Sequence, residues 1–203
     1  MPLAASVRNE VYKSLEQFEW RVNHLYLDNK GNVTVGVGHL ISSRTEMANI
    51  PMYSTQRKAP SNRATLAEKQ AEFDNVTKQS KGYVAHWYKQ HTTLIMQNLD
   101  INNQLNHHID AFYKELIRYY TKSNGFKSDF DNFPVEAQIA LFDMAYNMGL
   151  PKFKTQFINF NAAVKIEDWA TASKESSRFD VKKFRNDYVK ALFNSIPPSP
   201  STP

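Results

Sequence analysis

The stretch Glu19-Trp-Arg-Val-Asn-His-Leu-Tyr-Leu-Asp28-Asn-Lys-Gly-Asn-Val-Thr34-Val-Gly36-Val-Gly38-His39 decides the local fold and the candidate chemistry of this chain. Before it, apolar residues recur at helical spacing over residues 7–18, which predicts an amphipathic helix with Glu19 at or just past its end. Inside the stretch, apolar and polar residues alternate on both sides of the turn-forming residues 28–31. That pattern predicts a β-hairpin directly after the helix.

The second predicted strand carries two glycines, Gly36 and Gly38. Glycine weakens a strand and commonly marks a place where another group approaches the backbone closely. We therefore expect both glycines to lie against another part of the chain or a ligand.

Helices are predicted along most of the remaining sequence, and residues 42–63 are predicted to be loop. The helical segments are 64–78, 81–96, 105–124, 134–148, 153–164, 166–176 and 182–194. In the fourth of these, Pro134 suits the first turn, Gly149 offers a left-handed cap, and Pro151 is expected to prevent continuation. The aromatic side chains of Trp87, Tyr88, Tyr113, Tyr119 and Tyr120 are interpreted as core, with stacking on sugars as the alternative for the first two.

The composition is that of an ordinary globular protein, with 41% apolar and 22% charged residues, and only 6 of 203 residues are glycine. A formal net charge of +5 and a pI near 9.2 are compatible with polyanionic partners such as nucleic acid, anionic lipid or bacterial cell wall. The basic residues are scattered along the chain, which favours an ordinary solvated surface. No recognition motif for nucleic acid accompanies the charge, so a nucleic-acid partner is not expected. No apolar run approaches ~20 residues, so no membrane span is expected either.

The sequence contains no clear motif for a metal-binding or cofactor-binding site. The absence of cysteine excludes disulfides and thiolate metal sites. The pairs His107-His108 and His86-x4-His91 do not place two imidazoles on one helix face. A calcium loop beginning at Asp28 is rejected because Lys30 stands at a ligand position and no glutamate occupies the twelfth place. No phosphate-binding glycine loop occurs. We therefore expect neither a metal nor a cofactor.

Two carboxyl groups held by unlike elements suit the hydrolysis of a glycosidic bond. One carboxylic acid protonates the leaving oxygen, and the other carboxylate positions water or attacks directly. A glutamate and an aspartate nine positions apart also occur by chance, and Asp28-Asn-Lys-Gly is commonly only a turn. The combination with Thr34 and the Gly-x-Gly-His segment favours the catalytic interpretation.

The spacing Glu-x8-Asp-x5-Thr, followed by Gly-x-Gly-His, resembles the phage-type (T4-lysozyme-like) lysozymes of glycoside hydrolase family 24. Three later segments are similar to that family more loosely: Phe142-Asp-Met-Ala-Tyr-Asn-Met-Gly149, Ile166-Glu-Asp-Trp169 with Arg178, and Arg185-Asn-Asp-Tyr-Val-Lys-Ala-Leu-Phe193. The resemblance is strong over residues 10–41 and loose over 99–193. Residues 42–98 have no counterpart and form an apparent insertion, where specificity and accessory contacts would lie.

The resemblance implies roles for individual residues. Glu19 matches the general acid, Asp28 the carboxylate that positions water, and Thr34 the hydroxyl that helps to hold it. His39 matches the structural histidine that closes the motif, and Arg185 would pair with the acid. Gly36, Gly38 and Asn147 would support the groove.

The chain departs from the family immediately after the acid, where Trp20 replaces the usual glycine. A bulky indole at this position changes either the backbone or the groove wall. Two outcomes stay open: the indole desolvates Glu19 and raises its pKa, as an acid requires, or it packs in the core.

The fold that the resemblance implies is a mostly helical α+β, lysozyme-like domain with two lobes and a groove between them. Residues 1–203 form a single domain: about 20–98 make the small lobe with the hairpin, about 7–19 and 99–194 make the helical lobe, and 195–203 are a flexible tail. The implied activity is that of a muramidase, which cleaves the β-1,4 bond between N-acetylmuramic acid and N-acetylglucosamine by single-displacement inversion and so lyses bacteria.

Two other functions remain open: a lytic transglycosylase, which needs one acid but no water-holding aspartate, and an inactive wall-binding module. The first residues lack the pattern of a secretory signal. We therefore expect the protein to reach the periplasm or cell wall by another route. It would be either a phage endolysin released through a holin or an antibacterial effector domain delivered by a secretion system. We also expect a monomer. An effector would have a secretion carrier and an immunity protein as partners besides peptidoglycan.

Overall fold

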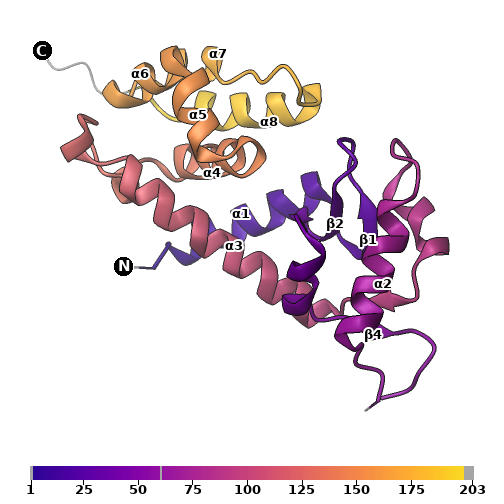
Figure 1. Cartoon of the computed structure of the whole chain (residues 1–203). Coiled ribbons are helices and arrows are strands. Elements are labelled where there is room, and N and C mark those ends of the chain that lie inside the picture. Colours follow the sequence, from indigo (N-terminus) through magenta and orange to yellow (C-terminus); the bar gives the residue numbers. More distant parts are fainter. Residues whose placement is uncertain (1, 60, 199–203) are drawn as a thin grey trace, which may run out of the picture. The chain divides into compact units, whose positions relative to one another are not determined.

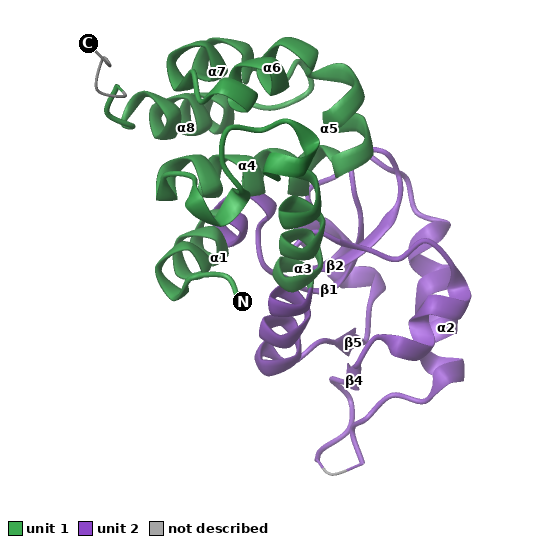
Figure 2. Cartoon of the chain, turned by 90° about the vertical axis from the view of Figure 1, so that its left-hand side faces the viewer, with its two compact units in different colours: residues 1–14, 108–203 green, residues 15–107 purple. Residues whose placement is uncertain are grey.

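The computed structural model describes residues 2–59 and 61–198, and the fold is α+β with helices predominating (Figure 1). The chain divides into two compact units, of which unit 1 holds residues 1–14 and 108–203 and unit 2 holds residues 15–107 (Figure 2). The predicted small-lobe residues 20–98 all belong to unit 2. Among the described residues, no helix is long and apolar enough to cross a membrane.

Unit 2 is built around a small antiparallel sheet that follows the end of helix α1 (Ala5–Glu19). The predicted hairpin is confirmed as β1 (Val22–Leu27) and β2 (Val33–Gly36), and a third strand, β3 (His39–Leu40), pairs with β2. Tyr26 pairs with Thr34 and Leu27 with Val33, while the backbone N–H of Asp28 donates to the carbonyl of Asn32 at 2.9 Å and closes the turn. The fully buried side chains of this sheet include Leu25 and Val35.

The rest of unit 2 differs in part from the sequence prediction. Helix α2 (Leu66–Thr77) is confirmed and begins with a capping box between Thr65 and Glu68. The loop predicted for 42–63 is wrong in part, because it contains the 3-10 helix η1 (Arg44–Asn49) and strand β4 (Tyr53–Ser54). The helix predicted for 81–96 is wrong: the 3-10 helix η2 (Ala85–His91) is followed by β5 (Leu94–Ile95), which pairs antiparallel with β4. A partner strand 40 residues away in the sequence overrides a weak local helical pattern here.

Helix α3 (Asn98–Tyr119) contributes to both units and confirms the amphipathic helix predicted around residues 105–116. It ends before the 3-10 helix η3 (Lys122–Asn124), where Gly125 adopts a left-handed backbone. In unit 1 it is followed by the 3-10 helix η4 (Phe130–Asn132) and five helices: α4 (Val135–Met148), α5 (Leu150–Gln156), α6 (Ile158–Ile166), α7 (Trp169–Glu175) and α8 (Lys183–Asn194).

The core of unit 1 is aromatic, and Tyr113 and Tyr120 belong to it, as predicted; Tyr119 is only half-buried. Fully buried phenylalanines from several helices contact one another edge to face, including Phe130 with Phe142 and Phe160 with Phe193. In unit 2, Tyr88 is completely buried. Of the tail predicted from residue 195, Ile196 is buried and therefore not frayed, and residues 199–203 lie outside the described part of the chain.

The end of α4 differs from the sequence prediction at Gly149 and Pro151. Gly149 has a positive φ of 75° but an extended ψ of 139°, so it does not form the predicted left-handed cap. Pro151 does not prevent continuation but stands in the first turn of α5, where its missing N–H costs nothing. The two prolines of this region therefore both mark helix starts.

A buried ion triad ties α4 to the C-terminal part of unit 1. The carboxylate of Asp143 is completely buried and accepts from Nη1 of Arg178 at 2.8 Å and from Nε of Arg185 at 2.9 Å. Nε of Arg178 also donates to the side-chain oxygen of Asn186 in α8 at 3.2 Å. Burying this carboxylate is tolerable because two guanidinium groups compensate its charge.

We expect Asp143→Ala to lower the free energy of unfolding by about 3–5 kcal/mol, because it leaves two buried guanidinium groups facing no carboxylate. The matched control is Asp187→Ala, which removes the solvent-exposed partner of Lys183 and should cost less than about 1 kcal/mol. Urea unfolding followed by circular dichroism measures both. Equal losses for the two variants would show that the triad is not a main support of unit 1.

Candidate functional site

Glu19 is the last residue of α1, and the residue after it ends the helix. Trp20 has a φ of 63°, in the left-handed region, which turns the chain sharply toward β1. This position suits glycine, since a side chain in the left-handed conformation is strained. The indole of Trp20 is 65% exposed, so the alternative that it packs in the core is wrong.

Arg21, which the sequence did not single out, fixes the end of α1 within unit 2. Its guanidinium donates to Glu16 at 2.5 Å and, through Nη2, to the Asn98 carbonyl at 2.8 Å and the Asn102 side chain at 2.6 Å. Both asparagines lie in the first turns of α3. The helix terminus that carries Glu19 is therefore held by contacts on two elements.

The two glycines predicted to mark close approach do so. A Cβ added to Gly38 would lie 3.2 Å from Oε2 of Glu19, and one added to Gly36 would lie 2.5 Å from the side-chain oxygen of Gln104. Both glycines also have a positive φ. The backbone at Gly38 therefore runs directly beside the Glu19 carboxylate, and the one at Gly36 beside α3.

Asp28 lies at the turn of the hairpin, where its carboxylate organises the loop. Oδ1 accepts from the backbone N–H groups of Lys30 and Asn32, both at 2.8 Å, and Oδ2 accepts from the Asn32 side chain at 3.0 Å. Oδ1 thus has two donors and Oδ2 has one. Asp28 is half-buried and keeps acceptor capacity on Oδ2 for a further donor.

Tyr26 relates the two carboxylates to each other. Burial raises the pKa of its phenol to about 12, and the negative charges of Glu19 and Asp28 add to that rise. Both carboxylates therefore lie near the same hydroxyl. Tyr26 was not identified from the sequence, although it lies only two residues before Asp28, near the end of β1.

Thr34 lies on the same face of the sheet as Tyr26, because it pairs directly with that residue across the hairpin. Its side chain is 4% exposed, and its hydroxyl donates to the carbonyl of Asn32 at 3.2 Å. With its proton so engaged, the hydroxyl oxygen has lone pairs left to accept a hydrogen bond. Thr34 is therefore the cross-strand neighbour of Tyr26, the residue on whose hydroxyl the charges of Glu19 and Asp28 act.

His39 belongs to β3 and pairs with Val35, on the opposite face of the sheet from Thr34. Burial lowers the pKa of the imidazole, and the charge of Glu46 opposes that effect. Glu46 is held by the backbone N–H and the hydroxyl of Ser42, both at 2.7 Å. The structural role that the resemblance implies for His39 stays a prediction.

The two remaining predicted residues belong to unit 1. Asn147 is exposed near the end of α4, and Arg185 is buried on α8 and pairs with Asp143. The pairing of Arg185 with Glu19 that the resemblance implies stays a prediction.

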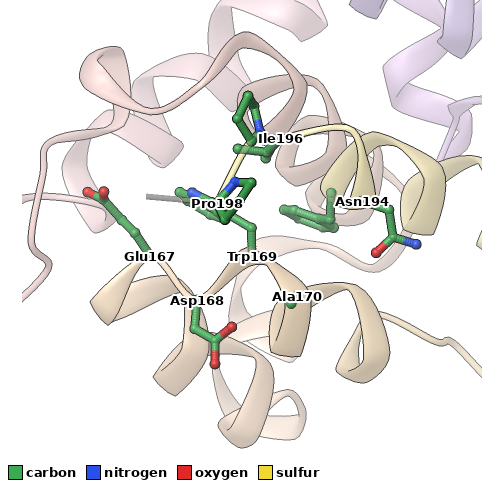
Figure 3. Close-up of a pocket in the computed structure, with 9 residues that line it drawn as sticks. Glu167, Asp168, Trp169, Ala170, Asn194, Ile196 and Pro198 are labelled. Atoms are coloured by element: carbon green, nitrogen blue, oxygen red, sulfur yellow. The ribbon is translucent and has the colours of Figure 1, made fainter. Parts of the chain in front are cut away.

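Two pockets in the described residues are distinct from this cluster. In unit 1, a pocket of about 440 Å³ lies between the start of α7 and the chain after α8, with Glu167, Trp169 and Ile196 among its lining residues (Figure 3). In unit 2, a smaller one of about 290 Å³ lies against α2. The described residues contain no group of three or more histidine or acidic side chains arranged to hold a metal.

A scan of the chain against protein-family models finds no match, and a search of curated proteins finds no relative.

We expect Trp20→Gly to raise the free energy of unfolding by about 0.5–1.5 kcal/mol, because glycine adopts a positive φ without strain. The indole is mostly exposed, so little burial is lost. Trp20→Ala is the control: it removes the indole but keeps a Cβ in the left-handed region, and should stay within about 0.5 kcal/mol of wild type. A glycine variant less stable than the alanine variant in urea unfolding would contradict the strain assigned to this turn.

Proposed function

We propose that this protein is a peptidoglycan hydrolase, a muramidase that cleaves the β-1,4 bond between N-acetylmuramic acid and N-acetylglucosamine. The observation that carries the proposal is that Glu19, which also approaches the backbone at Gly38, and Asp28 both contribute charge that acts on the Tyr26 hydroxyl. Glycoside hydrolases use two carboxyl groups that flank the glycosidic bond. The resemblance of residues 10–41 to the phage-type lysozymes supports the same reaction.

In this mechanism, Glu19 is the general acid and gives its proton to the glycosidic oxygen as the bond to the leaving sugar breaks. Asp28 accepts a proton from water through Oδ2, the oxygen that has only one donor in the hairpin. The water oxygen bonds to the anomeric carbon from the opposite face, which inverts its configuration. Thr34 helps to hold that water with the lone pairs of its hydroxyl.

The surroundings of Glu19 support its assignment as the acid. The absence of a side chain at Gly38 leaves room for the carboxyl group beside the backbone of the hairpin. The exposed indole of Trp20, next in the chain, offers a flat apolar face on which a sugar ring can stack. The same proposal includes a lysozyme-like groove between two lobes. It also includes delivery of the protein, either as a phage endolysin or as an effector domain that has a secretion carrier and an immunity protein.

We expect Glu19→Gln to lower the rate of peptidoglycan hydrolysis by at least about 100-fold, because glutamine has no proton to give to the leaving oxygen. The matched control is Glu10→Gln, an exposed position on the same helix, which should leave the rate unchanged. Release of reducing ends from purified cell walls measures turnover, and circular dichroism checks the fold. Near-wild-type turnover by Glu19→Gln would end the assignment.

Asp28→Asn should also lower the rate by about 100-fold or more, because the amide cannot accept a proton from water. Thr34→Ala should cost less, since it removes one contact to the water but no proton acceptor. Asn32→Ala is the control for the turn: it deletes the donor to Oδ2 and keeps the carboxylate. If Asn32→Ala lost as much activity as Asp28→Asn, the aspartate would act by shaping the turn and not as a base.

A lytic transglycosylase is the second candidate, and one observation favours it. The three hydrogen bonds that Asp28 accepts in its own turn explain this residue without any role in catalysis. A transglycosylase would keep its activity in Asp28→Asn and would release anhydromuramic ends. Mass spectrometry of the products distinguishes it from a hydrolase, which releases reducing ends.

A further inference from the structure

The pocket of about 290 Å³ in unit 2 lies where α2 faces the β4–β5 pair and the end of η2. It is at the small end of the range for ligand sites, so it suits a side chain or a similar small group and not a whole oligosaccharide. None of the described residues that line it is lysine or arginine, although the chain as a whole carries a net charge of +5. Its ionisable lining residues are Glu68, Glu72 and His91.

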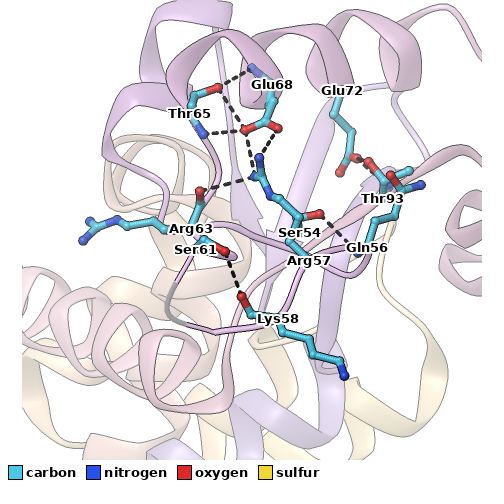
Figure 4. Close-up of polar contacts among 10 residues, drawn as sticks. All are labelled: Ser54, Gln56, Arg57, Lys58, Ser61, Arg63, Thr65, Glu68, Glu72 and Thr93. Carbon is cyan, nitrogen blue, oxygen red and sulfur yellow. Dashed lines mark hydrogen bonds and ion pairs between the residues drawn. The ribbon is translucent and has the colours of Figure 1, made fainter.

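Glu72 is buried in the wall of this pocket, with 6% of its surface exposed. Its Oε2 accepts from the backbone N–H of Thr93 at 2.6 Å and from the Thr93 hydroxyl at 3.1 Å (Figure 4). The same oxygen accepts from the backbone N–H of Leu94 at 2.9 Å. Its Oε1 is buried and has no partner. Burial raises the pKa of this carboxyl group, and the hydrogen bonds from Thr93 and Leu94 oppose the rise.

His91 brings a second unpartnered atom to the same pocket. Its Nε2 is buried without a hydrogen-bond partner, while the ring contacts the indole of Trp87 with centroids 4.7 Å apart. Neither a hydrogen bond nor an ion pair joins His91 to Glu72. A buried polar atom without a partner costs about 1–3 kcal/mol, so two of them in one pocket wall indicate a group that is meant to fill it.

The other acidic residue of the pocket is already neutralised. Glu68 pairs with Arg57 at 2.9 Å and accepts from the backbone and the hydroxyl of Thr65 (Figure 4). Glu72 has no such cation. A group that donates a hydrogen bond to Oε1 of Glu72 would satisfy this atom, and a positive charge on the same group would favour the ionised carboxylate.

We propose that this pocket binds a primary ammonium group at the end of an alkyl chain, as in lysine or a related diamino acid. An ammonium group has three donors, enough for Oε1 of Glu72, for Nε2 of His91 and for one polar group such as Gln56. Ala71 and Leu94 also line the pocket, and the alkyl chain would lie against them.

Neutral hydroxyl ligands and metal ions fit less well. A hydroxyl group satisfies the hydrogen bonds but leaves the charge of Glu72 uncompensated in a desolvated wall. A metal ion needs three or four protein ligands, and the described residues provide no such group here. The inference concerns a site separate from Glu19 and Asp28 and holds whether or not the chain hydrolyses peptidoglycan.

The test is a nuclear magnetic resonance titration of the full chain with Nα-acetyl-lysine amide. Its matched control ligand is Nα-acetyl-norleucine amide, which keeps the alkyl chain and lacks the ammonium group. We expect saturable shifts of the Thr93 and Leu94 amide signals, whose protons point at Glu72, with a Kd on the order of 1 mM. Norleucine amide and N-acetylglucosamine should leave these signals in place.

Two variants make the assignment specific. Glu72→Gln removes the charge while its amide oxygen still accepts from Thr93 and Leu94, and His91→Phe keeps a ring against Trp87 without Nε2. Each should weaken binding at least tenfold, whereas Glu115→Gln, an exposed position with the same change in net charge, should not.

Four outcomes would overturn the proposal. They are equal shifts by the norleucine ligand, shifts by N-acetylglucosamine in place of lysine, no shifts by any of the three ligands, and undiminished binding by both pocket variants.

Discussion

The Glu19 carboxyl group lies close to the backbone of the turn between β2 and β3, at residue 38, which has no side chain. A Cβ there would lie 3.2 Å from the carboxylate oxygen, in a backbone conformation that side chains rarely adopt. The approach also requires the chain to turn sharply after α1, which it does through the left-handed Trp20. A strained tryptophan and an obligatory glycine, 18 positions apart in the sequence, thus set the position of one acid.

The hairpin holds the other acid by a different device. Asp28 uses one carboxylate oxygen to bind two backbone N–H groups of its own turn and leaves the second oxygen with a single donor. The same side chain therefore shapes the loop and keeps acceptor capacity on its second oxygen. The proposed role as a base would use that oxygen, so it is compatible with the structural role in the turn.

Buried carboxylates elsewhere in the chain show how much compensation matters. Asp143 in unit 1 is fully buried and receives a guanidinium group on each oxygen, and Arg185 and Arg178 thereby tie three segments together. Glu72 in unit 2 is nearly as buried but has donors on one oxygen only and no cation. A buried charge without compensation is energetically costly. We therefore interpret the Asp143 cluster as structural and the pocket wall at Glu72 as a ligand site.

The sequence alone predicted the helix that ends at Glu19, the hairpin with its turn at Asp28 and the mostly helical character of the fold. It also predicted the close approach at Gly36 and Gly38. These features depend on hydrophobic periodicity and turn chemistry, which are local properties of the sequence. It did not determine the β4–β5 pair, since strand pairing across 40 residues depends on the partner and not on the weak helical pattern of residues 81–96. Nor did it reveal Tyr26 between the two acids, the exposure of Trp20 or the two unpartnered atoms near α2. Each of those features depends on which side chains pack against one another, and only the tertiary structure determines that packing.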